Sequence, residues 1–252
     1  MNIDINSDLG ESFGSFKMGN DAEVMKYITS ANIACGFHAG DPVVMEKTIK
    51  LALENQVAIG AHPGYPDLMG FGRRKMDLTP AEVKAYVFYQ IAALKAMTEA
   101  LGGKLQHVKA HGALYNEAAG NESVARAIAE AVLQLDSSLI FVGLANSNML
   151  EVAKKMGLKT AAEVFADRAY TNFGTLVPRS QPGAVIHDPK ICNDRVLQMI
   201  KEHTVEAING SKIPIDASTI CIHGDNPAAI ELARSLRDHL EKNGIEIQAM
   251  KA

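Results

Sequence analysis

The sequence has little of several residue types that define whole classes of protein. Only three of its 252 residues are cysteines, Cys35, Cys192 and Cys221, and no two of them form a CxxC pair. Scattered cysteines of odd number argue against a disulfide framework or a cysteine-rich zinc site, and they suit a reducing compartment. Tryptophan is absent and aromatic residues make up 6%, so the chain has no stacking platform for sugars or bases.

Excess charge and long apolar runs are also missing. The 25 basic and 29 acidic side chains leave a net charge of −4, which is too small to indicate a nucleic-acid-binding or membrane-binding surface. No stretch reaches the ~18 apolar residues of a membrane span. The first residues, MNIDINSDLGES, carry acids where a signal peptide carries basic and then apolar residues. We therefore expect no nucleic-acid partner, no membrane attachment and a cytoplasmic location.

What the sequence does contain is a regular alternation of strand and helix patterns. Helices between these strands are predicted from a capping residue followed by a proline, at Asp41-Pro42, Thr79-Pro80, Asp188-Pro189 and Asn226-Pro227. Glycines are expected to end helices at Gly102, Gly157, Gly210 and Gly244. Short apolar runs predict seven buried parallel strands, at 3–7, 31–35, 57–61, 106–110, 139–145, 160–165 and 218–222.

The absence of nucleotide-binding glycines bears on how this sheet is arranged. No GxGxxG follows the first strand, and Gly102-Gly103-Lys104 lacks the remaining residues of a P-loop. We therefore predict an α/β fold with a closed, TIM-like parallel barrel of about seven strands, which a chain of this length can complete in one domain, residues 1–252. The segment 174–187 is predicted to be a hairpin inserted after the sixth strand.

Four histidines stand at the predicted C-terminal ends of strands, in glycine-rich contexts: His38, His62, His111 and His223. Strand ends of a parallel barrel meet at one face, where active sites assemble. Any one of these histidines alone would be read as a capping or core residue, but four in register favour a functional cluster. Further polar residues leave the same strand ends: Asn6, Asp8, Glu11, Lys109, Asn116, Glu163, Arg168 and Asp225.

Two chemistries fit this cluster. Asp8, His38, His62 and His223 could supply nitrogen and oxygen ligands to a divalent metal ion. The same residues could act as general acids and bases on a polar substrate. His107 and His111 have a spacing that suits a shared ion only on a helix, since on a strand they lie ~13 Å apart.

Arginines form a second group of candidates. Arg73 and Arg74 form a glycine-flanked pair, and Arg168 and Arg179 stand near the sixth strand and the predicted hairpin. Planar guanidinium groups recognise carboxylates and phosphates. The alternative is a solvated surface, which we favour for Arg73 and Arg74 when they are taken alone.

Eight blocks along the chain resemble the LamB/YcsF family, which supplies the A subunit of bacterial 5-oxoprolinase. They are DINSDLGE (4–11), ANIACGFHAGD (31–41), GAHPGYPD (60–67), GFGRR (70–74), VKAHGALYN (108–116), EVFADRAY (163–170), LVPRS (176–180) and CIHGDNP (221–227). The resemblance implies a barrel of the glycoside hydrolase/deacetylase type. It also implies that the chain works with two partner subunits, B and C, to convert 5-oxoproline (pyroglutamate), ATP and water to glutamate, ADP and phosphate.

Opening a lactam requires an activated carbonyl oxygen, a positioned water and a proton for the leaving nitrogen. For this chemistry we expect catalytic roles for Asp8, Glu11, His38, Lys109, His111 and Asp225. We expect substrate binding by Asn6, His62, Arg73, Arg74, Asn116, Glu163, Arg168, Arg179 and His223. Two alternatives stay open, namely a stand-alone metal-dependent deacetylase-like hydrolase of a carbohydrate or amide, and a non-catalytic substrate-binding component of a complex.

Overall fold

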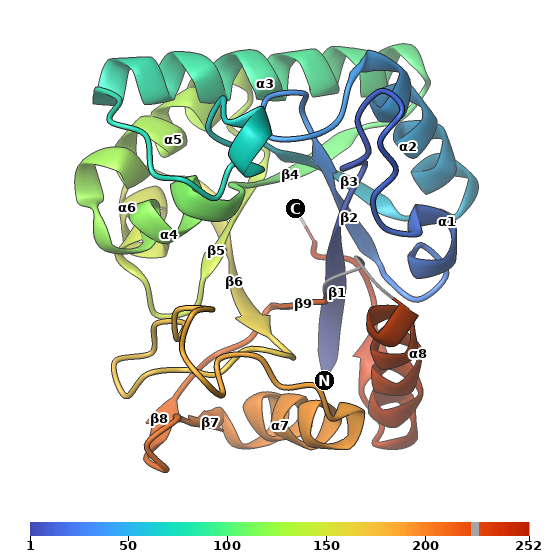
Figure 1. The fold of residues 1–252 in the computed structure, drawn as a ribbon, viewed down its shortest axis with the longest axis vertical. Helices are drawn as coiled ribbons and strands as arrows, with labels where there is room; N and C mark the ends of the chain where they lie inside the picture. Colours follow the sequence, from blue (N-terminus) through green and yellow to red (C-terminus); the bar gives the residue numbers. More distant parts are fainter. Residues whose placement is uncertain (223–226, 252) are drawn as a thin grey trace.

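A closed barrel of parallel strands forms the centre of the computed structural model, which describes residues 1–222 and 227–251 (Figure 1). Each strand pairs in parallel with the next, and the last pairs with both the sixth and the first, which closes the ring. The predicted seven-stranded parallel barrel is therefore confirmed. Its strands are β1 (Asn2–Leu9), β2 (Ser30–Ala34), β3 (Ala58–His62), β4 (Leu105–Lys109), β5 (Ile140–Leu144), β6 (Lys159–Phe165) and β9 (Thr219–Cys221).

Helices surround this ring, and three of them start at predicted capping residues, while the fourth such residue, Asn226, lies outside the described residues. Asp41 and Asp188 accept backbone N–H groups at the starts of their helices, and Thr79 forms a capping box with Glu82. The helices are α1 (Asp21–Val24), α2 (Pro42–Glu54), α3 (Pro80–Ala100), α4 (Gly112–Gly120), α5 (Glu122–Leu135), α6 (Asn148–Lys155), α7 (Pro189–Glu202) and α8 (Pro227–Lys242), with a short 3₁₀ turn η1 (Leu68–Gly70). None of the helices in the described part of the chain is long and apolar enough to cross a membrane.

Glycines follow three of the helices as predicted. Gly102, Gly157 and Gly244 have positive φ angles just beyond the ends of α3, α6 and α8. Gly210 is different, because it lies in the turn between β7 (Thr204–Glu206) and β8 (Lys212–Pro214), which form an antiparallel pair after α7. The prediction of a helix end at Gly210 is wrong.

The segment 174–187 contains no strand, so the hairpin predicted there is not formed. Instead it folds back on residues 168–170, with single antiparallel bridges between Leu176 and Tyr170 and between Val185 and Arg168. The guanidinium of Arg168 donates to the carbonyl oxygens of Val177 at 2.7 Å and Ala184 at 3.4 Å. The carbonyl oxygens of Val177 and Ala184, which could pair two strands of a hairpin, accept hydrogen bonds from Arg168 instead.

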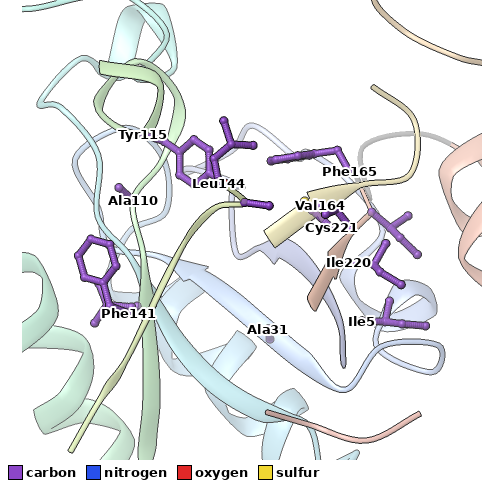
Figure 2. Close-up of a cluster of buried hydrophobic side chains, with 14 of the residues drawn as sticks. Ile5, Ala31, Ala110, Tyr115, Phe141, Leu144, Val164, Phe165, Ile220 and Cys221 are labelled. Atoms are coloured by element: carbon purple, nitrogen blue, oxygen red, sulfur yellow. The ribbon is translucent and has the colours of Figure 1, made fainter. Parts of the chain in front are cut away.

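Apolar side chains fill the space between barrel and helices. Ile5, Val164 and Ile220 occupy neighbouring positions on β1, β6 and β9 and lie close together in Figure 2. They belong to one large core cluster that includes residues of α7 and α8. A smaller cluster from β5 and β6 packs against Met250. Just before it, β10 (Glu246–Ile247) pairs with β1.

Gly60 allows the interior of the barrel to hold a histidine ring. A Cβ atom at this position would lie 2.0 Å from Nε2 of His107. We expect Gly60→Ala to lower the free energy of unfolding by about 1–3 kcal/mol, because the buried ring must move. Gly120→Ala is the matched control, since nothing lies within 4 Å of its added Cβ. Urea denaturation of both variants measures the difference, and equal stabilities would contradict this account.

Candidate active site

A buried ammonium group lies at the C-terminal end of the barrel. The Nζ atom of Lys109 is 2.9 Å from Oδ1 of Asp8 and 2.7 Å from Oε1 of Glu163. It also donates to Oδ1 of Asn6 at 3.2 Å and to the sulfur of Cys221 at 3.2 Å. Burial alone would lower the pKa of Lys109, but the charge of Asp8 and its other neighbours raises it well above its ordinary value. Lys109 therefore stays charged.

The carboxylate of Asp8 lies between this ammonium and a histidine. Its Oδ1 also accepts from Nδ2 of Asn32 at 2.8 Å, and its Oδ2 lies 3.3 Å from Nε2 of His62. Burial by itself raises the pKa of Asp8, yet His62 and Lys109 hold it well below the ordinary value. Asp8 is thus an ionised acid at the edge of the site.

Three of the predicted histidines meet beside Asp8. His62 ends β3, while His38 and His111 follow β2 and β4. The rings of His38 and His111 stack in parallel with their centroids 3.8 Å apart, and His62 meets both edge-on. Burial lowers the pKa of His38 and of His111 well below 6.5.

Glu11 joins these histidines to form a cluster that could hold a metal ion. Glu11, His38, His62 and His111 each bring one potential ligand atom, and these atoms lie within 4.8 Å of one another. This differs from the set predicted from the sequence, Asp8, His38, His62 and His223. A left-handed backbone at Gly10 (φ 68°) turns the chain after β1, so that Glu11 joins the cluster beside Asp8. His223 lies outside the described residues.

Two glycines in the loops allow the backbone to pack directly on these rings. A Cβ atom at Gly64 would lie 2.7 Å from Nδ1 of His38. One at Gly72 would lie 2.7 Å from Cβ of His38 and 2.8 Å from Cδ2 of His111. The glycines of the PGY and GFG segments therefore fix the positions of His38 and His111.

Above the cluster is a cavity of about 540 Å³. Eight of the predicted site residues line it: Asp8, Glu11, His62, Arg73, Lys109, His111, Asn116 and Arg179. Sequence reasoning missed its less polar wall, which includes Met18, Phe71, Tyr115, Phe165 and Leu176. Only the position of Tyr115, one helical turn after His111, could have indicated that it belongs to the site.

The remaining predicted residues take other places. Asn6 and Glu163 are buried below the cavity and bond to Lys109, while His38 is buried beside His111. The structure does not bring Arg74 or Arg168 to the cavity. The guanidinium of Arg74 is mostly exposed and pairs with Asp67. The guanidinium of Arg168 donates to a backbone carbonyl oxygen of the 174–187 segment. Asp225, like His223, lies outside the described residues.

Comparison with known proteins agrees with this architecture. A profile of the LamB/YcsF family matches residues 3–252. The chain belongs to the LamB/YcsF family. It is 60% identical over 250 residues to the 5-oxoprolinase A subunit of Alkaliphilus metalliredigens, covering 99% of this chain and 98% of that one. It is 58% identical over 251 residues to the protein of the same name from Pyrococcus abyssi, covering 100% and 98%.

A solved structure supports the same assignment to the LamB/YcsF family. The crystal structure of the lactam utilization protein from Thermus thermophilus matches with a TM-score of 0.95 and 48% identity, covering 99% of this chain and 100% of that one. The relatives thus carry the names of one component of 5-oxoprolinase and of a lactam utilization protein, which supports a hydrolase role for this member of the family.

Replacing the buried ammonium tests its contribution to stability. We expect Lys109→Met to lower the free energy of unfolding by about 3–5 kcal/mol, because Asp8 and Glu163 are left buried without their cation. Lys155→Met is the control, since Lys155 forms an exposed pair with Glu151 that should contribute about 0–1 kcal/mol.

Combining Lys109→Met with Glu163→Gln should recover part of the loss, because one of the two stranded carboxylates is then neutral. Denaturant unfolding of the three variants gives the comparison. Wild-type stability in Lys109→Met would show that the buried pairs do not hold the barrel together.

Proposed function

We propose that this chain is the lactam-binding and ring-opening subunit of an ATP-dependent 5-oxoprolinase, acting together with two partner subunits, B and C. The observation that carries the proposal is an ionised carboxylate, Asp8, beside a histidine cluster in a cavity with arginines along its walls. A cavity of about 540 Å³ has room for a small cyclic amide. The names of the relatives point to the same substrate class.

The lactam needs activation before water can open it. A five-membered cyclic amide is stabilised by resonance, and transfer of a phosphoryl group from ATP to its carbonyl oxygen removes that stabilisation. Water then adds to the carbonyl carbon, and the carbon–nitrogen bond breaks as a proton reaches nitrogen. This leaves an acyl phosphate, which a second water hydrolyses to glutamate and phosphate. We assign ATP binding to the complex, because this sequence carries neither a GxGxxG fingerprint nor a P-loop.

Asp8 is the residue best placed to handle the protons. It takes a proton from the attacking water and can return it to the leaving nitrogen. Lys109 then acts as a positioning residue, because its ammonium is engaged by Asp8 and Glu163. This revises the expectation that Lys109 neutralises charge on the substrate directly.

Arg73 and Arg179 are proposed to bind the carboxylate of 5-oxoproline. Both line the cavity, and the guanidinium of Arg73 lies over the ring of Phe71 at 5.0 Å. Guanidinium groups bind carboxylates through paired hydrogen bonds. Asn116, which also lines the cavity, can bond the lactam amide.

Three thiols support a cytoplasmic location as part of this proposal. Cys35, Cys192 and Cys221 are buried and unbridged. Burial raises the pKa of Cys35 to about 12 and that of Cys192 to about 11. Unbridged, protonated thiols fit a reducing compartment.

Reconstitution tests the activity. The chain alone should neither cleave ATP nor release glutamate from 5-oxoproline, and addition of both partner subunits should produce glutamate and phosphate together. Asp8→Asn should lower the turnover of the assembled complex by about 10²–10⁴-fold, because the general base is lost. Assembly, followed by gel filtration, should be unchanged.

Other outcomes would replace the proposal. Release of acetate from an acetylated sugar by the lone chain without ATP would establish the deacetylase-like hydrolase, which the Glu–His₃ cluster favours. Full turnover of the complex carrying Asp8→Asn would leave this chain as a binding component.

Removing a wall arginine should affect substrate binding more than chemistry. We expect Arg73→Met to raise KM for 5-oxoproline by about 10-fold or more, the value of one charge-assisted hydrogen bond. Arg126→Met, which removes an exposed guanidinium paired with Glu122 on α5, is the control. Steady-state kinetics of the complex decide, and equal KM values for the two variants would exclude Arg73 from substrate binding.

A further inference from the structure

Two buried histidines each present one ring nitrogen to the other. Nδ1 of His62 lies 2.7 Å from the carbonyl oxygen of Lys109, and Nε2 of His111 lies 2.8 Å from that of Phe71. A backbone carbonyl can only accept, so each of these nitrogens carries a hydrogen. The other two nitrogens, Nε2 of His62 and Nδ1 of His111, face each other at 3.0 Å.

More acceptors surround the same point. Oε1 of Glu11 lies 3.7 Å from Nδ1 of His111, and Oδ2 of Asp8 lies 3.3 Å from Nε2 of His62. The nearby ammonium of Lys109 contacts the other oxygen of Asp8, Oδ1. Nitrogen and carboxylate oxygen atoms gathered this closely form a set of electron-pair donors that a single cation can bridge.

The ring nitrogens of His38 give an independent observation that points to a ligand. Its side chain is fully buried, and neither ring nitrogen has a hydrogen-bond partner among the described residues. Its Nε2 lies 3.6 Å from Oε1 of Glu11 and so faces the cluster. A buried polar atom without a partner lowers the stability of a protein, and such atoms are rare in native structures.

We propose that Glu11, His38, His62 and His111 bind one divalent transition-metal ion, with Zn²⁺ as the ion that fits best. Three imidazole nitrogens and one carboxylate oxygen form a donor set typical of zinc, whereas Mg²⁺ and Ca²⁺ prefer oxygen ligands. The carbonyl oxygens that accept from His62 and His111 are the outer partners that metal-binding histidines commonly have. When bound, the ion supplies a Lewis acid beside the cavity.

This site differs from the metal set expected from the sequence, since Glu11 and His111 replace Asp8 and His223. It also stands apart from the proposed function, because metal binding can be measured on the isolated chain. Failure of lactam hydrolysis would leave the metal site intact, and failure of metal binding would leave the assignment of the substrate intact.

Metal content and affinity test the inference. The tag-free chain, stripped with a chelator, should take up one Zn²⁺ per molecule in a calorimetric titration, and Co²⁺ in its place should give the visible absorption of a tetrahedral or five-coordinate ion. His38→Gln and His111→Gln should each weaken Zn²⁺ binding by at least about 100-fold, since loss of outer partners alone costs 10–100-fold. His203→Gln, which removes an exposed histidine paired with Asp216, should bind like the wild type.

Circular dichroism of the metal-free variants controls for folding. Glu11→Gln is a further variant that keeps all three rings in place, and it should weaken binding in a chain that folds normally.

A proton shared between His62 and His111 is the competing explanation for the 3.0 Å separation of their nitrogens. Absence of stoichiometric Zn²⁺ uptake, together with a single N–H···N proton between His62 and His111 in NMR spectra, would overturn the proposal. Equal Zn²⁺ affinity of the wild type, His111→Gln and Glu11→Gln would overturn it too.

Discussion

One buried cation links strands on three sides of the barrel. Lys109 on β4 reaches Asp8 on β1 and Glu163 on β6. An ammonium in the interior costs several kcal/mol unless partners surround it, so these strands are held at the registers that bring the carboxylates to Nζ. A slip of one residue would turn a carboxylate to the outer face. The ammonium of Lys109 therefore stabilises the closed ring of strands and holds Asp8 at the floor of the cavity.

Hydrogen bonds extend this polar centre toward the opposite end of the barrel. Asn6 accepts from Lys109 and from Asn32, and donates to Thr219, which in turn donates to Asp4. Burial raises the pKa of Asp4, although neighbouring hydroxyl groups bond to it. Branched apolar residues usually fill such an interior. Because each of these polar groups has its partner, the interior supports one arrangement of strands and gives the site a rigid base.

The sequence predicted the strands and most helix ends because those features depend on local patterns. Apolar runs and cap–proline pairs act within a few residues. Contacts between distant loops leave no such pattern in the sequence. For this reason the sequence did not predict that Arg74 pairs with Asp67, or that the 174–187 segment bonds to Arg168 instead of forming a hairpin. The histidines were found because strand ends of a barrel must meet. The sequence could not predict that Glu11, rather than Asp8, joins the histidine cluster, because this depends on the left-handed backbone at Gly10.

Packing holds the histidine rings of the site in their orientations. Gly64 and Gly72 bring two loops against the ring of His38, and Gly72 also lies against His111. Rotation of either ring would push atoms into backbone, while a flip of His62 would give up its bond to the carbonyl of Lys109. The loops that carry Gly64 and Gly72 therefore fix the positions of His38 and His111 together. Their glycines hold the imidazoles close together, at a separation that suits the proposed cation.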